Sequence, residues 1–116
     1  MSTKDLGRAG EELAAQYLTQ MGAEILERNY TIRGGEIDLI AEMDGILHFV
    51  EVKTRSTVAF GRGAEAVTRT KQRLISRTAL YYLKQHHALD RVCRFDVIEI
   101  CPPDIRYIPR AFDYIP

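Results

Sequence analysis

The sequence predicts an α/β protein in which a mixed β-sheet is flanked by helices. Two stretches, residues 4–21 and about 65–86, repeat apolar side chains at helical spacing, and five shorter apolar stretches have strand-like composition. The pair Asp44-Gly45 joins two of these short stretches and is typical of a tight β-hairpin turn. Because the order α-β-β-β-α-β-β contains no repeat or linker, we expect a single domain over residues 1–116.

The first helix is expected over residues 4–21, where one face is apolar or small and Gly22 supplies a stop signal. Glu11 borders this apolar face, so its side chain can point toward the sheet. Glu12 has more polar helical neighbours and is expected to face the solvent. The two adjacent acids are therefore predicted to differ in role.

Three strands are expected next. A first strand covers residues 24–32, Gly34-Gly35 turns the chain, and the hairpin strands cover residues 36–43 and 46–54. Both faces of the hairpin carry apolar side chains, so we expect it to lie in the centre of the sheet.

The second half begins with residues 55–64, whose Ser, Thr and Gly content predicts a loop. The second helix is expected over about 65–86, with Thr68 near its start. Residues 94–100 read as a strand buried on one face. Pro102-Pro103 breaks this strand, and residues 105–108 are expected to form a short last strand.

The hairpin places charged side chains among apolar ones. A two-residue turn at Asp44-Gly45 makes Asp38 face Glu51 and Glu36 face Lys53, all on one side of the sheet. Two carboxylates about 5 Å apart repel by about 3 kcal/mol at an effective dielectric constant near 20. Folding alone does not select such a pair, but a divalent cation converts the repulsion into chelation.

The cation that fits this pattern is Mg²⁺ or Mn²⁺, because hard cations prefer carboxylate oxygens, water and substrate phosphate. Lys53 would orient or deprotonate the attacking water, or neutralise charge that develops on a phosphate. A structural alternative stays open, in which Glu36 and Lys53 form a plain ion pair and Asp38 or Glu51 turns to solvent. Glu36 and Gln72 are noted as accessory candidates.

The charge of the chain is balanced overall but uneven along its length. Residues 53–84 contain eight basic residues and one acid, a net charge of +7, whereas the rest of the chain carries −7. A basic, acid-poor segment beside the acidic pair is the pattern expected for contact with a phosphate backbone. The nucleic-acid-binding candidates are Arg33, Arg55, Arg62, Arg69, Lys71, Arg73 and Arg77.

Other classes of protein are not indicated. No apolar run is long enough to cross a bilayer and the first residues are too polar for a signal peptide, so we expect a cytoplasmic protein with no membrane partner. The two cysteines lack the spacing of a zinc finger and are expected to be reduced. No phosphate-binding glycine loop, dinucleotide fingerprint or Ser-His-Asp set is present.

These residues resemble both the signature of a nuclease superfamily and the sequence blocks of one protein family. Asp38, a spacer and then Glu51-Val52-Lys53 resemble the D…(D/E)XK signature of the restriction-endonuclease-like superfamily. The whole chain is also similar to the YraN family of bacterial proteins, described as endonucleases similar to archaeal Holliday-junction resolvases. The blocks that carry this similarity are GRAGEELA (7–14), GEIDLIA (35–41), FVEVKTR (49–55) and AVTRTKQRL (66–74).

The resemblance implies an α/β/α restriction-endonuclease-like core and metal-dependent cleavage of a DNA backbone. By matching position, Asp38 and Glu51 would bind the metal, Lys53 would be the catalytic lysine, and Glu11 would be the helix-one carboxylate, acting through a water molecule. The expected substrate is DNA, with branched or junction DNA as the refinement. Resolution of a junction needs two strand cuts and implies a homodimer.

A second function remains open at the level of the sequence. The chain could instead be a non-catalytic nucleic-acid-binding module in DNA repair, recombination or uptake, whose acidic pair performs no chemistry. A third reading is a structural protein with a surface cluster of ion pairs. Only the nuclease requires both the metal and Lys53.

Overall fold

The computed structural model describes residues 3–55 and 67–116, with side chains from residue 7 onward. Arg62 and most of the loop predicted over 55–64 lie outside the described residues. The predicted order of helices and strands is confirmed. The elements are α1 (Thr3–Gln20), β1 (Glu24–Ile32), β2 (Gly35–Met43), β3 (Ile46–Thr54), α2 (Arg69–Gln85), β4 (Cys93–Cys101) and β5 (Asp104–Phe112).

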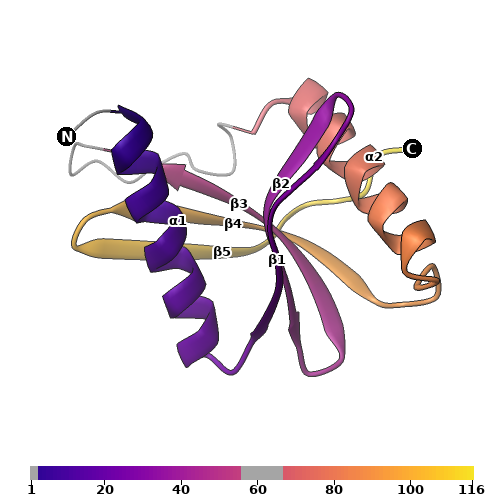
Figure 1. The fold of residues 1–116 in the computed structure, drawn as a ribbon, viewed down its shortest axis with the longest axis horizontal. Helices are drawn as coiled ribbons and strands as arrows, with labels where there is room; N and C mark the ends of the chain where they lie inside the picture. The colour runs from indigo at the N-terminus through magenta and orange to yellow at the C-terminus, as the bar shows by residue number, and fades with distance from the viewer. Residues whose placement is uncertain (1–2, 56–66) are drawn as a thin grey trace.

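The strands form one five-stranded sheet in the order β1-β2-β3-β4-β5 (Figure 1). Among the described strands, only β3 and β4 are a parallel pair, and α2 lies between them in the chain, as a parallel pair requires a crossover. The other neighbours are antiparallel. The predicted α/β class with a mixed sheet is confirmed, and this arrangement is consistent with a restriction-endonuclease-like core. Neither described helix is long and apolar enough to cross a bilayer.

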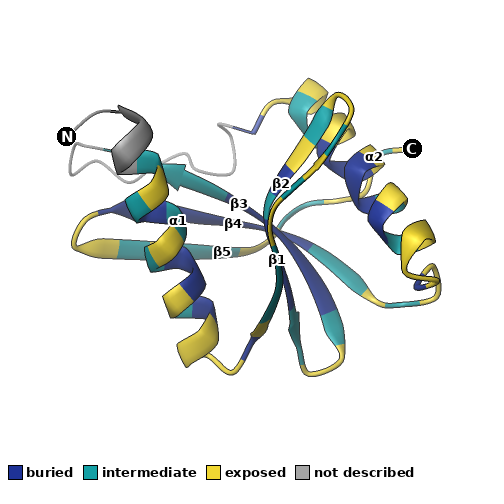
Figure 2. Ribbon diagram, in the orientation of Figure 1, coloured by how far each residue is buried: buried dark blue, intermediate teal, exposed yellow. Residues whose placement is uncertain are grey.

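The two helices cover opposite faces of the sheet. Phe49 on β3 packs with Ile75 and Tyr82 of α2, whereas the next residue, Val50, packs with Leu18 of α1. Successive side chains of a strand point to opposite faces, so α1 and α2 must lie on either side of β3. Figure 2 shows the central strands β3 and β4 as the most continuously buried part of the sheet. The hairpin is central, as predicted.

Helix α2 begins later than predicted. Its first residue is Arg69 rather than a residue near 65, because Thr68 caps the helix. The Thr68 side chain accepts a hydrogen bond from the backbone N–H of Lys71 at 3.2 Å, which satisfies one of the free donors of the first turn. This cap sets the position of Lys71, two residues into the helix.

Strand β5 is longer than the predicted segment 105–108 and continues to Phe112. Pro109 cannot donate to the ladder, and the register between β4 and β5 shifts at this point. The Asp96 carboxylate accepts the backbone N–H of Arg110 at 2.9 Å, and Arg110 has a positive φ of 50°. The pairing then resumes, so the proline produces a bulge and not the end of the strand.

Helix α1 packs closely against the end of β3 at Gly10. A Cβ at this position would overlap Thr54 Oγ1 and lie 3.1 Å from Thr54 Cβ. At Gly7, one helical turn earlier, a Cβ would meet nothing within 4 Å. Close approach at Gly10 brings the helix face that carries Glu11 to the sheet.

We expect Gly10→Ala to destabilise the protein and Gly7→Ala to stabilise it. Alanine favours a helix by up to about 1 kcal/mol over glycine, but overpacking against Thr54 costs roughly 1–3 kcal/mol. Urea denaturation of both variants measures the two changes in the free energy of unfolding. Equal stabilisation by both substitutions would contradict the close contact between α1 and β3.

Candidate functional site

The acidic site lies where the β2–β3 hairpin opens. The predicted register is correct for the five pairs from Met43–Ile46 to Leu39–Val50, but within the described strands the ladder ends there. Asp38 and Glu51 are therefore not ladder partners, and neither are Glu36 and Lys53. Instead, Asp38 Oδ2 accepts the backbone N–H of Val52 at 2.8 Å.

This side-chain contact also breaks the alternation of β2. Ile37 packs in the α2-side cluster and Leu39 in the α1-side cluster, although strict alternation predicts one shared face. Ile37 and Leu39 therefore lie on opposite sides of the sheet. The change of face falls at Asp38, whose carboxylate accepts the Val52 N–H just beyond the last paired residues, Leu39 and Val50.

Asp38 and Glu51 lie close together, as predicted. They are not paired in the ladder; Asp38 reaches β3 through its hydrogen bond from the Val52 N–H. Burial raises the pKa of Asp38 to about 8, with a further increase from the Glu51 charge and from a hydrogen bond between the two side chains. The Val52 N–H lowers the pKa, and the Glu11 charge raises it again. At neutral pH, without a cation, Asp38 therefore holds a proton.

Two lysines complete the cluster. Lys71 Nζ lies 2.8 Å from Glu51 Oε1, whose side chain is only 7% exposed. Burial disfavours the charged form of Lys71, but the hydrogen bond and charge of Glu51 outweigh it and raise the pKa of Lys71. Burial lowers the pKa of Lys53, and so do the hydrogen bond and charge of Lys71, while Glu51 and Asp38 partly oppose this. The site thus contains one firmly charged lysine and one that loses its proton more readily.

Glu11 and Glu12 differ as predicted. Glu11 is half-buried, acts on Asp38 through its charge, and borders a cavity of about 260 Å³. Glu12 is exposed and binds Arg28, with 2.6 Å between Oε2 and Nη1. That hydrogen bond and charge lower the pKa of Glu12. Glu11 is thus the carboxylate of α1 that approaches the acidic pair.

The donor set fits a hard divalent cation. Among the described residues, no group of three or more His, Cys, Asp or Glu side chains is gathered closely enough to bind a metal by itself. Mg²⁺, however, is commonly held by one or two carboxylates with water and substrate phosphate as the other ligands. Asp38 and Glu51 supply two carboxylates. Burial is the main cause of the raised pKa of Asp38, and the charge of Glu51 adds to it; a cation would relieve this second contribution.

The remaining candidates are exposed or bind other partners. Glu36 and Arg33 are exposed, and the Gln72 amide donates to the Val67 carbonyl at 2.9 Å. Arg55 Nε donates to Glu99 Oε2 at 2.8 Å, so this arginine neutralises a fully buried carboxylate. Lys71 thus contacts the acidic pair through Glu51, whereas these four side chains are exposed or bind other groups.

The arginine row of α2 is exposed, but on a different side from Lys71. Arg69 and Arg73 each lie two residues from Lys71, which is about 200° around an α-helix. They therefore point away from the sheet when Lys71 points toward Glu51. Arg77 lies one turn beyond Arg73, and its Nη2 donates to the Gly34 carbonyl at 3.4 Å. The row forms an outer basic surface, distinct from the acidic site.

Buried acids on β4 were missed by the sequence analysis. Asp96 is 1% exposed and accepts hydrogen bonds from the Tyr107 hydroxyl at 2.6 Å and from Arg110 N–H, and it contacts His48 Nδ1 at 2.6 Å. Burial and the Asp96 contact raise the pKa of Tyr107. Residues 94–100 were expected to be buried on one face only, whereas β4 contributes to the cores on both faces of the sheet and is paired with β3 and β5 at its edges. Only knowledge of the strand order reveals this burial.

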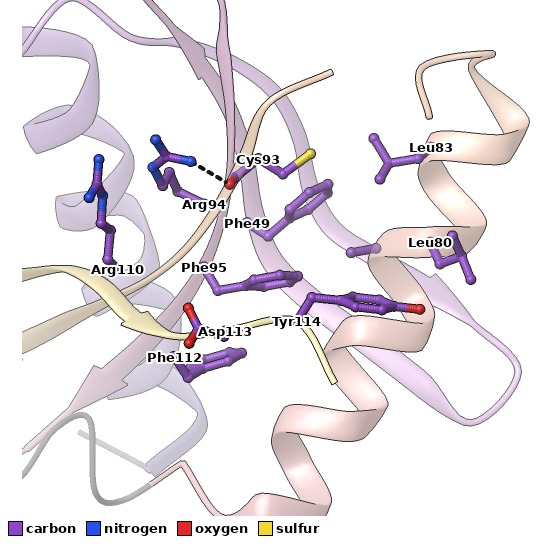
Figure 3. A pocket seen from close by; sticks show the side chains of 11 residues that line it. Phe49, Leu80, Leu83, Cys93, Arg94, Phe95, Arg110, Phe112, Asp113 and Tyr114 are labelled. Carbon is purple, nitrogen blue, oxygen red and sulfur yellow. Dashed lines mark hydrogen bonds between the residues drawn. The ribbon is translucent and has the colours of Figure 1, made fainter. Parts of the chain in front are cut away.

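A separate cavity of about 390 Å³ lies between α2 and the C-terminal segment (Figure 3). Its wall contains the stacked rings of Phe49, Phe95 and Phe112, with centroids 5.5 and 5.2 Å apart. Tyr114 and Leu80 lie at its other side. None of the acidic-site residues lines this cavity, so it is not part of the candidate site.

Comparison with known proteins identifies the family. The model of an uncharacterised protein family, UPF0102, matches residues 10–100, a range that includes Glu11, Asp38, Glu51 and Lys53. The chain belongs to the UPF0102 family. This confirms the predicted membership of the YraN family, which is the same family.

Curated UPF0102 relatives align over nearly the whole chain. The chain is 49% identical to a protein of Symbiobacterium thermophilum over 95% of its own length and 98% of the relative. It is 46% identical to a protein of Geobacter metallireducens over 97% and 96%, and 45% identical to one of Caldicellulosiruptor saccharolyticus over 86% and 85%. Each relative is described only as a UPF0102 protein.

We expect Asp38→Asn to stabilise this UPF0102 protein at pH 9 in the absence of metal. An unfolded Asp titrates near 3.8 and the folded one near 8, so the native state holds an extra proton between these values. Wild-type stability therefore falls as the pH rises through this window, by on the order of a few kcal/mol. Asparagine still accepts the Val52 N–H but carries no charge. Denaturation in EDTA from pH 4 to pH 9 measures the difference.

Glu36→Gln is the matched control, because Glu36 is exposed on the same strand, two residues away. This substitution should not reproduce the gain in stability at pH 9 that is expected for Asp38→Asn. An Asp38→Asn variant that gains no stability relative to the wild type between pH 4 and pH 9 would contradict the close approach of the two acids.

Proposed function

We propose that this protein is a metal-dependent endonuclease that hydrolyses phosphodiester bonds of DNA in the cytoplasm, with branched DNA as its preferred substrate. The observation that carries the proposal is the close pair of Asp38, which is partly buried, and Glu51, which is buried, with Lys53 beside it. The pair destabilises the fold while both acids are charged, which indicates a role other than stability. The resemblance to D…(D/E)XK nucleases supports the same assignment.

Each residue of the candidate site has a defined role in this proposal. Asp38 is oriented by the Val52 N–H and Glu51 by Lys71, so both carboxylates present fixed oxygens to Mg²⁺ or Mn²⁺. The bound cation would supply Lewis-acid stabilisation of the phosphate charge. Lys53, with its lowered pKa, can take a proton from the attacking water, and when protonated it neutralises the phosphate. Glu11 orients water from the α1 side.

The basic surface supports nucleic acid as the partner. Arg69, Arg73 and Arg77 are exposed on α2, the helix whose Lys71 reaches the acidic pair. Phosphate contacts from such residues hold a duplex without reading its sequence. A structure-selective enzyme needs this kind of contact, because it recognises the shape of DNA. A homodimer would provide the two cuts that resolve a junction.

A non-catalytic DNA-binding module is the second candidate, and one observation favours it. The Lys71 ammonium already pairs with Glu51 at 2.8 Å, so the chain can neutralise this carboxylate without a metal. In this alternative the Lys71–Glu51 pair is purely structural. The two candidates differ in what a divalent cation does to the protein.

We expect wild-type protein to cut labelled junction, flap or linear DNA with Mg²⁺ or Mn²⁺ and not with EDTA. Glu51→Gln and Lys53→Ala should reduce the cleavage rate at least 100-fold, while DNA affinity in EDTA stays within about twofold. Glu12→Gln and Lys84→Ala are matched controls on exposed side chains and should cut normally. Binding without cleavage across the whole panel would favour the module.

A thermal shift experiment separates the candidates without a substrate. Lys71→Met leaves Glu51 buried without its partner and should lower the melting temperature in EDTA. If the site binds a cation, Mn²⁺ should raise the melting temperature of Lys71→Met more than that of the wild type. No effect of Mn²⁺ on either protein would count against a metal site.

A further inference from the structure

A second hollow lies along α2, on the side away from the 390 Å³ cavity. It has a volume of about 430 Å³ and runs between the β1–β2 turn and the outer part of the helix. We name it the Tyr81 groove. The residues that line it are Tyr30, Thr31, Ile32, Arg33, Arg77, Tyr81 and Gln85.

The groove combines two cations with an exposed aromatic ring. Arg33 and Arg77 are both exposed, and Arg77 is held against the turn by its hydrogen bond to the Gly34 carbonyl. Tyr81 is 56% exposed, although the neighbouring Tyr82 is buried in the core at 5%. No acidic side chain is among the seven lining residues, so the groove carries a charge of +2.

The wall of the groove is fixed by the core. The Tyr30 hydroxyl donates to Gln85 Oε1 at 2.7 Å, and the Tyr30 ring packs edge-on against Tyr82 at 5.2 Å between centroids. Tyr82 in turn packs against Phe49 in the centre of the sheet. Tyr81 and Arg77 therefore stand on a supported surface, so a ligand does not have to order the groove.

We infer that the Tyr81 groove binds unpaired nucleotides of a DNA strand, with a base stacked on Tyr81 and phosphates held by Arg33 and Arg77. Guanidinium groups suit phosphate oxygens, and aromatic rings with nearby arginines are the common platform for single strands. A paired duplex does not fit this chemistry, because its bases already stack on each other and present no free face. This inference rests on the proposed action on nucleic acid and names the part of the substrate that is recognised.

The position of the groove connects it with the acidic site. Tyr81 lies ten residues after Lys71 on the same helix, about 15 Å along its axis, and Lys71 contacts Glu51. On the sheet side, Arg33 precedes Asp38 by five residues. The separation of Tyr81 and Lys71 along the helix axis corresponds to roughly four stacked nucleotides at about 3.4 Å each. The groove would thus place an unpaired arm near the cleavage site and favour branched DNA.

The test is fluorescence anisotropy in EDTA, where no cleavage occurs, with a labelled oligothymidylate and a duplex of the same length. We expect Tyr81→Ala to weaken binding of the single strand about tenfold or more and binding of the duplex less than twofold. Tyr81→Phe keeps a stacking ring and should bind the single strand as wild type does. Leu89→Ala, a truncation of a side chain that is 59% exposed outside the groove, is the matched control.

Tyr81→Trp provides a direct probe, because the chain contains no tryptophan. The oligothymidylate should quench its fluorescence if a base stacks on the ring. Unchanged affinity in Tyr81→Ala, or no quenching in Tyr81→Trp on binding, would overturn the inference and leave the proposed function intact. Failure of the wild type to bind any DNA would overturn both.

Discussion

The close approach of two carboxylates, the partly buried Asp38 and the buried Glu51, is the constraint on which the site depends. Asp38 accepts the Val52 N–H where the pairing of β2 with β3 ends, and Lys71 forms an ion pair with Glu51. Burial and the neighbouring charge leave Asp38 with a pKa of about 8, so the metal-free protein keeps a proton in the pair. A divalent cation can replace that proton, and this replacement links the fold of the hairpin to the proposed chemistry.

Helix α2 contributes side chains to the core, to the acidic site and to the outer surface. Its inner face packs Ile75 and Tyr82 into the core, its first turn directs Lys71 to Glu51, and its outer face carries the arginine row and Tyr81. In the proposed complex, a nucleic acid on the outer face of α2 would be separated from the acids by the helix itself. The family model includes the whole of this helix, and the curated UPF0102 relatives align over it without any assigned activity. The three surfaces of α2 therefore offer a physical basis for proposing an activity.

Local patterns predicted much of this structure. The Asp-Gly turn predicted the hairpin register, the spacing of α1 predicted that Glu11 and not Glu12 approaches the sheet, and Thr68 was expected near the start of α2. The start of α2 was placed too early although its cap is local, whereas the other errors share one cause, because each depends on tertiary contacts. The ladder opens at Asp38 through a side-chain hydrogen bond, β5 continues past Pro109 through a contact with Asp96, and burial of Asp96 and Glu99 follows from the strand order. No periodicity within a single segment carries that information.

The most direct test of the account is a titration of the Asp38 carboxyl carbon by NMR, first in EDTA and then with saturating Mg²⁺. The account predicts a pKa near 8 without metal and a markedly lower pKa with Mg²⁺, because the cation favours the charged form. A pKa near that of a free Asp in EDTA, or a raised pKa that Mg²⁺ does not change, would contradict the claim that this pair is built for a cation.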